Sequence, residues 1–271
     1  MEAQLWVGKG RVKSTPRACS VAGPLATGDW PEDTKKPVCF RRSDESCVEF
    51  LLSQPRSRRL LASRQWPVGQ LASESSMPNQ FTPQFYKRFY VSPRTRVTTK
   101  AEMHRRASAV AAMVQQLELK VTRILDAGCG LGWMRAALVE AFPNATYIGL
   151  EVSEHLCAEH GWVHASLATY KPRGHFDLVI CYDVLQYLSD REAAQAISNL
   201  ANFCRGALYF HAPTLEDWEH NADRSCSDGD IRLRPAQWYR TRLARDFRHA
   251  GFGIHVRRGV PLYLWELEKP R

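Results

Sequence analysis

Residues 124–132 read Ile-Leu-Asp-Ala-Gly-Cys-Gly-Leu-Gly, a short apolar run that gives way to three alternating glycines. An apolar run of this length is typical of a buried strand, and the pattern predicts a helix over residues 133–142, before Pro143. Glycines in such a strand-to-helix turn let the backbone bend sharply and approach a ligand, because no Cβ intervenes. The helix that follows offers free N–H groups, which suit a carboxylate or a phosphate.

Strand and helix patterns alternate on both sides of this turn. Capping boxes, in which Ser or Thr is followed three residues later by Glu, predict helix starts at Thr99 and Ser189. A long helix is expected from Pro235 to Gly251. The expected strands lie at 124–126, 146–151, 162–165, 176–182, 207–212, 253–256 and 262–267. This alternation predicts an α/β protein whose parallel sheet is covered by helices on both faces.

An acidic residue ends the second expected strand. Glu151 stands 19 residues after Gly132, and a carboxylate there can accept hydrogen bonds from both hydroxyls of a ribose. The glycine turn and this acid together predict a ribose-bearing ligand at the carboxyl edge of the sheet. A dinucleotide fingerprint would need a small residue at position 133, where the sequence has Trp133.

Two motifs resemble those of class I S-adenosylmethionine-dependent methyltransferases. The glycines are spaced G-x-G-x-G with Asp126 two residues before the first, and residues 176–188, FDLVICYDVLQYL, are similar to the family's fourth-strand motif. The resemblance covers about residues 83–268. It implies a Rossmann-like, seven-stranded, mostly parallel sheet with an antiparallel last strand, and S-adenosylmethionine as the cofactor. A glycine turn that binds no ligand is the alternative.

The resemblance also implies which residues contact the cofactor. Asp126 and the glycine loop would hold its methionine end, Glu151 its ribose, and Val152 would lie beside its adenine. Ser166 and Leu167 stand where the family often has an Asp or Asn that contacts the adenine amine. The full set of implied cofactor contacts is Asp126, Gly128, Cys129, Gly130, Gly132, Glu151, Val152, Ser166, Leu167, Cys181 and Tyr182.

Transfer of an activated methyl group demands alignment and exclusion of water more than it demands side-chain chemistry. A general base is needed only when the accepting atom arrives protonated. His211, at the end of the expected fifth strand, and Asp183, after the fourth, are the candidate catalytic residues. Each could instead bind nearby backbone groups, as buried histidines and turn acids often do.

Two further segments are candidates for covering the ligand. Residues 85–90, FYKRFY, could form a roof over the pocket or pack in the core. Residues 214–233 form a long polar connection, which is expected to be a lid that shapes the acceptor site. Within it, the run Ser-Asp-Gly-Asp at 227–230 lacks the spacing of an EF-hand loop, so a turn and no metal site are expected.

Composition and charge limit which binding partners and which cellular compartment we expect. The net charge of the 271 residues is +9, but the excess is divided between residues 1–76 and the rest, so no nucleic-acid partner is expected. The apolar runs are strand-sized, so no membrane partner is expected. Eight cysteines without a C-x-x-C pair favour a reduced, cytoplasmic setting. Residues 1–76 are expected to be a disordered extension, and residues 77–271 the methyltransferase domain.

These observations predict an enzyme that moves a methyl group from S-adenosylmethionine to an O, N or S atom of a small molecule. The chain beyond the expected sheet is too short for a separate RNA- or protein-recognition domain. The motif at 181–184 also lacks the Asn/Asp-Pro-Pro-Tyr/Phe pattern of enzymes that methylate amines of nucleic-acid bases. Two alternatives stay open: a non-catalytic adaptor or sensor that binds S-adenosylmethionine, and a nicotinamide-dependent oxidoreductase. The oligomeric state is left open.

Overall fold

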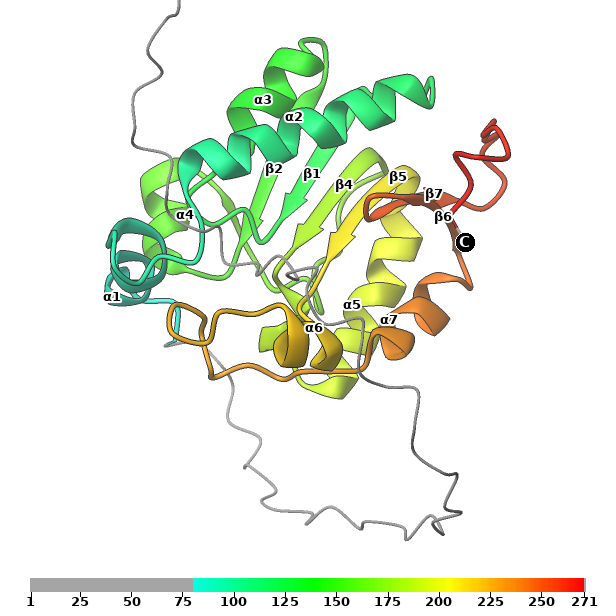
Figure 1. Ribbon diagram of the computed structural model, residues 1–271. Helices are drawn as coiled ribbons and strands as arrows, with labels where there is room; N and C mark the ends of the chain where they lie inside the picture. Colours follow the sequence, from blue (N-terminus) through cyan, green and yellow to red (C-terminus); the bar gives the residue numbers. More distant parts are fainter. Residues whose placement is uncertain (1–79, 271) are drawn as a thin grey trace, which may run out of the picture. The chain divides into compact units, whose positions relative to one another are not determined.

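A single seven-stranded sheet in the order β3-β2-β1-β4-β5-β7-β6 organises the part of the chain that the structure describes, residues 80–270 (Figure 1). The structure is a computed structural model. Neighbours among β1 to β5 pair in parallel, whereas β7 runs antiparallel to both β5 and β6. The strands are β1 (Arg123–Ala127), β2 (Thr146–Glu151), β3 (Val163–His164), β4 (Phe176–Tyr182), β5 (Cys204–His211), β6 (Phe247–Gly251) and β7 (Ile254–Arg257). The predicted mostly parallel α/β sheet is confirmed, while the predictions for residues 1–76 lie outside the described residues.

Helices begin where the sequence provides caps. The Thr99 side chain accepts a hydrogen bond from the Glu102 backbone, and the Glu102 carboxylate accepts one from the Thr99 backbone. Ser189 and Glu192 form the same pair of hydrogen bonds. Both predicted capping boxes are therefore confirmed. The helices are α1 (Pro83–Tyr86), the π-helical turn η1 (Lys87–Val91), α2 (Lys100–Gln116), α3 (Arg135–Ala141), α4 (Glu154–His160), the 3-10 turn η2 (Leu185–Tyr187), α5 (Asp190–Phe203), α6 (Leu215–His220) and α7 (Ala236–Leu243). No helix among these is both long enough and apolar enough to cross a membrane.

The core has one layer on each face of the sheet. Successive strand side chains point to opposite faces, so Val179 packs in the cluster that includes residues of α5 and α7, and its neighbour Ile180 packs with those of α2 and α3. Figure 1 shows α2 and α3 on one side of the sheet and α5 and α7 on the other. Strands buried on both faces explain the apolar run at residues 178–181 of β4.

Two predictions for the C-terminal part are wrong. The helix expected from Pro235 to Gly251 ends at Leu243, because Phe247 begins β6, which pairs antiparallel with β7. No strand forms at 262–267, where Tyr263 and Trp265 are 88% and 81% exposed. Local patterns predicted a helix for the first segment and a strand for the second, but pairing within the sheet decided which segment became a strand.

Asp177 joins three central strands at the edge of the sheet where they begin. Its Oδ2 accepts hydrogen bonds from the backbone N–H groups of Thr122 and Arg123, at the start of β1, over 2.8 and 3.0 Å. Its Oδ1 accepts one from Arg205 of β5 over 2.5 Å. Burial alone would raise the pKa of Asp177, but these hydrogen bonds outweigh burial and lower the pKa to about 2.

Replacement of this carboxylate by an amide, Asp177→Asn, should destabilise the fold by ~2 kcal/mol at neutral pH, since a pKa lowered on folding is a contribution to stability. That contribution is present above the ordinary pKa near 3.8 and is lost as the pH falls through the folded value of about 2. Denaturant unfolding between pH 7 and pH 2 measures it. The gap between wild type and variant should be constant above pH 5 and should narrow below pH 4. Glu140→Gln, on the exposed side of α3, is the control, and an equal loss in both variants would contradict the assignment.

Candidate functional site

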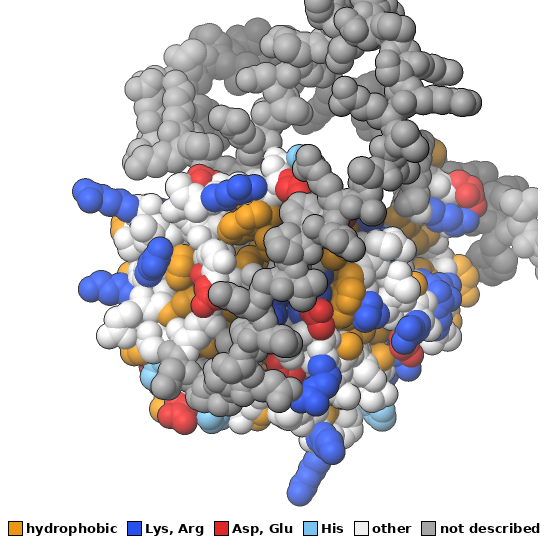
Figure 2. Space-filling view, turned by 90° about the horizontal axis from the view of Figure 1, so that it is seen from below, with side chains coloured by type: hydrophobic (Ala, Val, Ile, Leu, Met, Phe, Trp, Pro, Cys, Tyr) orange, Lys and Arg blue, Asp and Glu red, His pale blue; other side chains and the backbone are white. Residues whose placement is uncertain are grey.

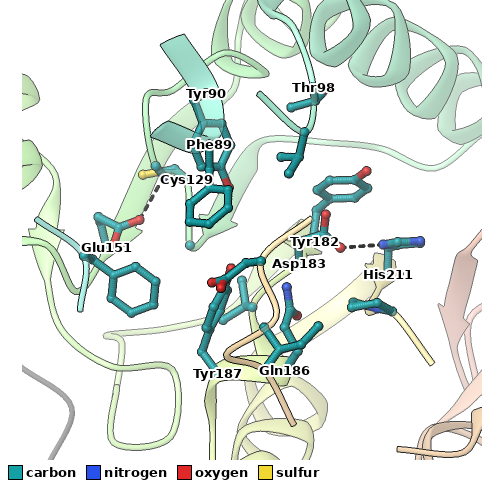
Figure 3. A pocket seen from close by; sticks show the side chains of 18 of the residues that line it. Phe89, Tyr90, Thr98, Cys129, Glu151, Tyr182, Asp183, Gln186, Tyr187 and His211 are labelled. Atoms are coloured by element: carbon teal, nitrogen blue, oxygen red, sulfur yellow. Dashed lines mark hydrogen bonds and ion pairs between the residues drawn. The ribbon is translucent and has the colours of Figure 1, made fainter. Parts of the chain in front are cut away.

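A cavity of about 280 Å³ lies where the parallel strands end. Carboxyl ends of parallel strands meet at one edge of a sheet, so residues far apart in sequence converge there. The cavity is lined by the turn after β1, the ends of β2, β4 and β5, and residues of α1, η1 and α6 (Figure 3). In Figure 1, α1 and α6 lie beyond the tips of the strand arrows, where they cover this edge.

The turn after β1 depends on glycine at its first position. Gly128 has φ +76°, and a Cβ built on it would lie 2.3 Å from Cγ2 of Val184, so neither the conformation nor the space admits a side chain. The N–H groups of Gly128 and Cys129 both donate to the carbonyl of Leu150 in β2. Gly130 has φ +50°, and a Cβ built on it would only touch the Tyr86 ring at 3.7 Å, an ordinary van der Waals contact. The turn is therefore fixed against the neighbouring strand while its middle faces the cavity.

Glu151 is 4% exposed and is held by backbone N–H groups. Its Oε2 accepts from Gly130 over 2.9 Å, and its Oε1 accepts from Val152 and Ser153 over 2.8 and 3.1 Å. The Tyr86 hydroxyl lies 3.5 Å from Oε1. Figure 3 shows the dashed contact of Glu151 at one side of the cavity. The carboxylate thus joins the glycine turn to the end of β2.

Asp126 lies beneath the same turn. The hydroxyl of Tyr147 donates to its Oδ2 over 2.6 Å. Burial raises the pKa of Asp126 to about 6, the Tyr147 hydrogen bond opposes this rise, and the charge of Glu151 adds to it. Two carboxyl groups, Asp126 and Glu151, therefore line the cavity beside the glycine turn.

Asp183 and His211 form an acid–histidine pair at the other side of the cavity. Asp183 Oδ1 lies 2.7 Å from Nδ1 of His211, and the Asp183 N–H donates to the His211 carbonyl over 3.1 Å. Parallel pairing of β4 with β5 sets Tyr182 opposite His211, which places the next residue within reach. Asp183 has φ +55°, a left-handed conformation that is strained for a residue with a Cβ. Strain of this kind gathers at functional sites, where the surroundings hold it in place.

Aromatic stacking fixes the histidine ring. The ring of Tyr182 stacks on His211 at 4.9 Å and 20°, and on Tyr209 at 6.1 Å and 8°. The Arg106 guanidinium lies 4.8 Å from the centre of the Tyr182 ring and donates to the Tyr209 hydroxyl. Burial alone would lower the pKa of His211, but the charge and hydrogen bond of Asp183 outweigh burial and raise the pKa above 6.5.

The structure brings together most of the residues that the sequence predicts for the site. Gly132 and Cys181 are the exceptions. A Cβ on Gly132 would meet Trp162 at 2.7 Å, and Cys181 is fully buried in the core layer of α5. Cys181 and Tyr182 point to opposite faces of β4, so only Tyr182 reaches the cavity. The predicted residues that line it are Asp126, Gly128, Cys129, Gly130, Glu151, Val152, Ser166, Leu167, Tyr182, Asp183 and His211.

Both predicted covering segments contribute to the cavity wall. Tyr86 and Phe89 are buried and also line the cavity, so the segment 85–90 is a roof and part of the core at once. The connection 214–233 contains α6, which begins at a third capping box on Thr214, a pattern that the sequence shows at Thr214-Leu215-Glu216-Asp217. The expected turn at 227–230 is present, since the Asp230 N–H donates to Asp228. Among the described residues, no group of three or more His, Cys, Asp or Glu could hold a metal ion.

Trp133, Gln186, Tyr187 and Asp228 are among the lining residues that were not predicted as site residues from the sequence. Gln186 and Tyr187 belong to the turn η2 that follows β4. Their place in the 176–188 motif was a signal, but polarity and spacing alone did not say which side chains point into the cavity.

The hydrogen bond between Asp183 and His211 generates a test by NMR titration. Asp183→Asn removes the charge that raises the histidine pKa, while burial and the charge of Arg106 still lower it, so the pKa of His211 should fall. The groups facing the ring are Asp183, Arg106 and Asp217. Asp230→Asn, on an exposed residue, should leave the titration unchanged. A His211 pKa that is the same in wild type and Asp183→Asn would contradict the pair.

Comparisons with known proteins agree with the resemblance in the sequence. Residues 125–206 match the family described as "Methyltransferase domain". A magnesium-protoporphyrin O-methyltransferase of Synechocystis sp. is 31% identical over 122 residues, which are 40% of this chain and 52% of that protein. The chain therefore spans about half the length of this curated relative.

Solved structures also resemble the chain. The magnesium protoporphyrin IX methyltransferase of Synechocystis with bound S-adenosylmethionine is 22% identical, with 58% of this chain and 79% of that chain covered and a TM-score of 0.42. The sugar N-methyltransferase KedS8 of Streptoalloteichus sp. is 21% identical, with 58% and 88% covered and a TM-score of 0.47.

Proposed function

Since this chain carries a class I S-adenosylmethionine-dependent methyltransferase domain, we propose that it binds S-adenosylmethionine and transfers the methyl group to an O, N or S atom of a small molecule. The observation that carries this proposal is the division of the cavity into two ends. Figure 3 shows Glu151 at one side and the Asp183–His211 pair at the other, with Tyr90 and Tyr187 between them. One end suits an adenosyl group, and the other offers a base to an acceptor.

The residues at the Glu151 end fit the cofactor. A carboxylate has about four acceptor positions, and backbone N–H groups fill three of those on Glu151. The Tyr86 hydroxyl approaches the fourth position only to 3.5 Å, so the ribose hydroxyls can displace it there. Val152 and Leu167 line the cavity next to Glu151 and would flank the adenine. The middle of the glycine turn and Asp126 would hold the methionine end.

The bound cofactor supplies a methyl group that is already activated by its positive sulfur. The chain then has to orient the acceptor, exclude water and, where the acceptor carries a proton, remove that proton. Because Nδ1 of His211 is engaged with Asp183, Nε2 is the nitrogen that can accept a proton. The charge and hydrogen bond of Asp183 raise the pKa of His211, which makes its imidazole a stronger proton acceptor. The aromatic side chains of α1 and α6 limit the access of water.

Two further proposals concern the bounds of the domain and the location of the protein in the cell. We take residues 77–271 as the catalytic domain. We propose that the protein is located in the cytoplasm. Cys129, Cys157, Cys181 and Cys204 form no disulfide, and disulfides are rare in the reducing conditions of that compartment.

The Glu151 assignment predicts the effect of Glu151→Gln on cofactor affinity. Loss of the charge removes a charge-assisted hydrogen bond to the ribose, so the Kd for S-adenosylhomocysteine should rise roughly tenfold or more in calorimetry. Glu154→Gln, three residues away and exposed on α4, is the matched control and should bind as wild type does. The thermal midpoint of each variant is measured alongside to confirm folding. Unchanged affinity in a folded Glu151→Gln protein would contradict the ribose site.

Methyl transfer itself is tested with cofactor labelled in its methyl group and extract as the source of acceptors. Wild type should produce a labelled small molecule. His211→Ala should slow transfer by roughly a hundredfold or more, the usual effect of losing a general base, while its affinity for S-adenosylhomocysteine stays within about twofold. Tight cofactor binding by wild type without labelling of any acceptor would favour the adaptor alternative.

A further inference from the structure

We propose that the acceptor is a protonated amine carried on an apolar, aromatic-sized body, bound at the side of the cavity formed by Asp228, Gln186 and the Asp183–His211 pair. This inference rests on the proposed function, because it names the class of molecule that receives the methyl group.

The first observation is the sign of the charges around the cavity. The chain as a whole is basic, with a net charge of +9, and Figure 2, which views the molecule from below, shows Lys and Arg side chains spread over that face and its outline. Yet among the described residues that line the cavity there is no Lys and no Arg. Its charged lining residues are Asp126, Glu151, Asp183, Asp217 and Asp228. A carboxylate or phosphate acceptor would meet no counter-charge here, whereas an ammonium group would.

The second observation is a pair of buried acceptor atoms without hydrogen-bond partners. Gln186 is 4% exposed, and its Oε1 has no partner among the described residues. Oδ2 of Asp228 is also buried without one, although Oδ1 accepts the N–H of Asp230. Buried polar atoms are rarely left unpaired in native structures, so a ligand that donates hydrogen bonds is expected beside them. An ammonium group has three donors and no acceptor.

The remaining acids of the cavity are already committed. Asp217 caps α6, with hydrogen bonds from the Thr214 backbone and hydroxyl and from Asn221. Asp183 holds His211. Asp228 accepts the N–H of Asp230 and lies within hydrogen-bond reach of the Tyr187 hydroxyl, while its buried Oδ2 is left for a ligand at this side. Burial and the charges of nearby groups, Asp228 among them, raise the pKa of both Tyr90 and Tyr187.

The third observation is the aromatic wall. Tyr90, Tyr187, Trp133 and Trp218 line the cavity, and rings attract cations to their faces as well as burying apolar groups. Figure 3 places Gln186 between Tyr187 and His211 in the view, below Asp183. Gln186, Asp228 and His211 line the same cavity, and the proposal places the amine between them.

The chemistry balances with the groups present. An ammonium nitrogen has no free electron pair, so it first gives one proton to Nε2 of His211, whose positive charge Asp183 stabilises. The nitrogen lone pair then forms a bond to the methyl carbon, the carbon–sulfur bond breaks, and its electron pair stays on sulfur. The product is a methylated ammonium group, and the proton on His211 passes to solvent.

Calorimetry with three probes of one shape tests the proposal on protein saturated with S-adenosylhomocysteine. The probes are 2-phenylethylamine, 2-phenylethanol and 3-phenylpropanoate. All three carry a phenyl ring on a two-carbon chain, which ends in an ammonium, a hydroxyl or a carboxylate group. The amine should bind at least tenfold more tightly than the other two. Asp228→Asn should abolish that preference, and Asp230→Asn, exposed and two residues away, should keep it.

The outcomes separate the two proposals. If S-adenosylhomocysteine binds but the amine shows no preference over the alcohol and the acid, or none of the three binds, the amine inference is overturned while the cofactor site stands. If Asp228→Asn retains the preference in full, the assigned carboxylate is wrong and the inference fails with it. If S-adenosylhomocysteine itself does not bind, the proposed function fails first. Labelling of a nitrogen in the product made from extract would support the inference independently, and labelling of oxygen or sulfur would contradict it.

Discussion

The carboxylate of Glu151 connects the two segments that a ligand in this cavity would meet. It accepts N–H groups from the glycine turn after β1 and from its own strand end, at Gly130, Val152 and Ser153. A buried carboxylate is costly unless hydrogen bonds compensate its charge, so the turn has to present an N–H group inward, and Gly130 does so at positive φ. Three bonds satisfy the charge without filling every acceptor position. The same contacts that stabilise the turn therefore leave a place for a ribose.

Much of the fold could be predicted from local patterns. Strands β2 and β4 have the predicted bounds, because a central parallel strand appears in the sequence as a run with clear first and last residues. Both capping boxes could be predicted because each is a pair of residues three positions apart. The C-terminal part could not be predicted in this way. Phe247 and Gly251 fit the end of a helix as well as a strand, and pairing with β7 decided between them. Residues 262–267 are mostly apolar, as a strand would be, but no strand of the described residues pairs with them.

The cofactor end of the site was easier to predict than the acceptor end, because a strand, a glycine turn and an acid follow one another along the chain. The contact of Asp183 with His211 depends on the parallel register of β4 and β5, which no local pattern encodes. Cys181, which was also predicted to contact the cofactor, does not line the cavity for a simpler reason. Neighbouring residues of a strand face opposite ways, so Cys181 and Tyr182 could not both reach the cavity from β4.

The central claim is that the adenosyl group lies on Glu151 with its sulfur toward the Asp183–His211 pair. A crystal structure of the chain with S-adenosylhomocysteine tests it most directly. We expect both ribose hydroxyls within hydrogen-bond distance of the Glu151 carboxylate, the Tyr86 hydroxyl displaced from it, and the sulfur facing the side of the cavity that holds His211. A ribose bound away from Glu151, or a sulfur turned from His211, would contradict the account.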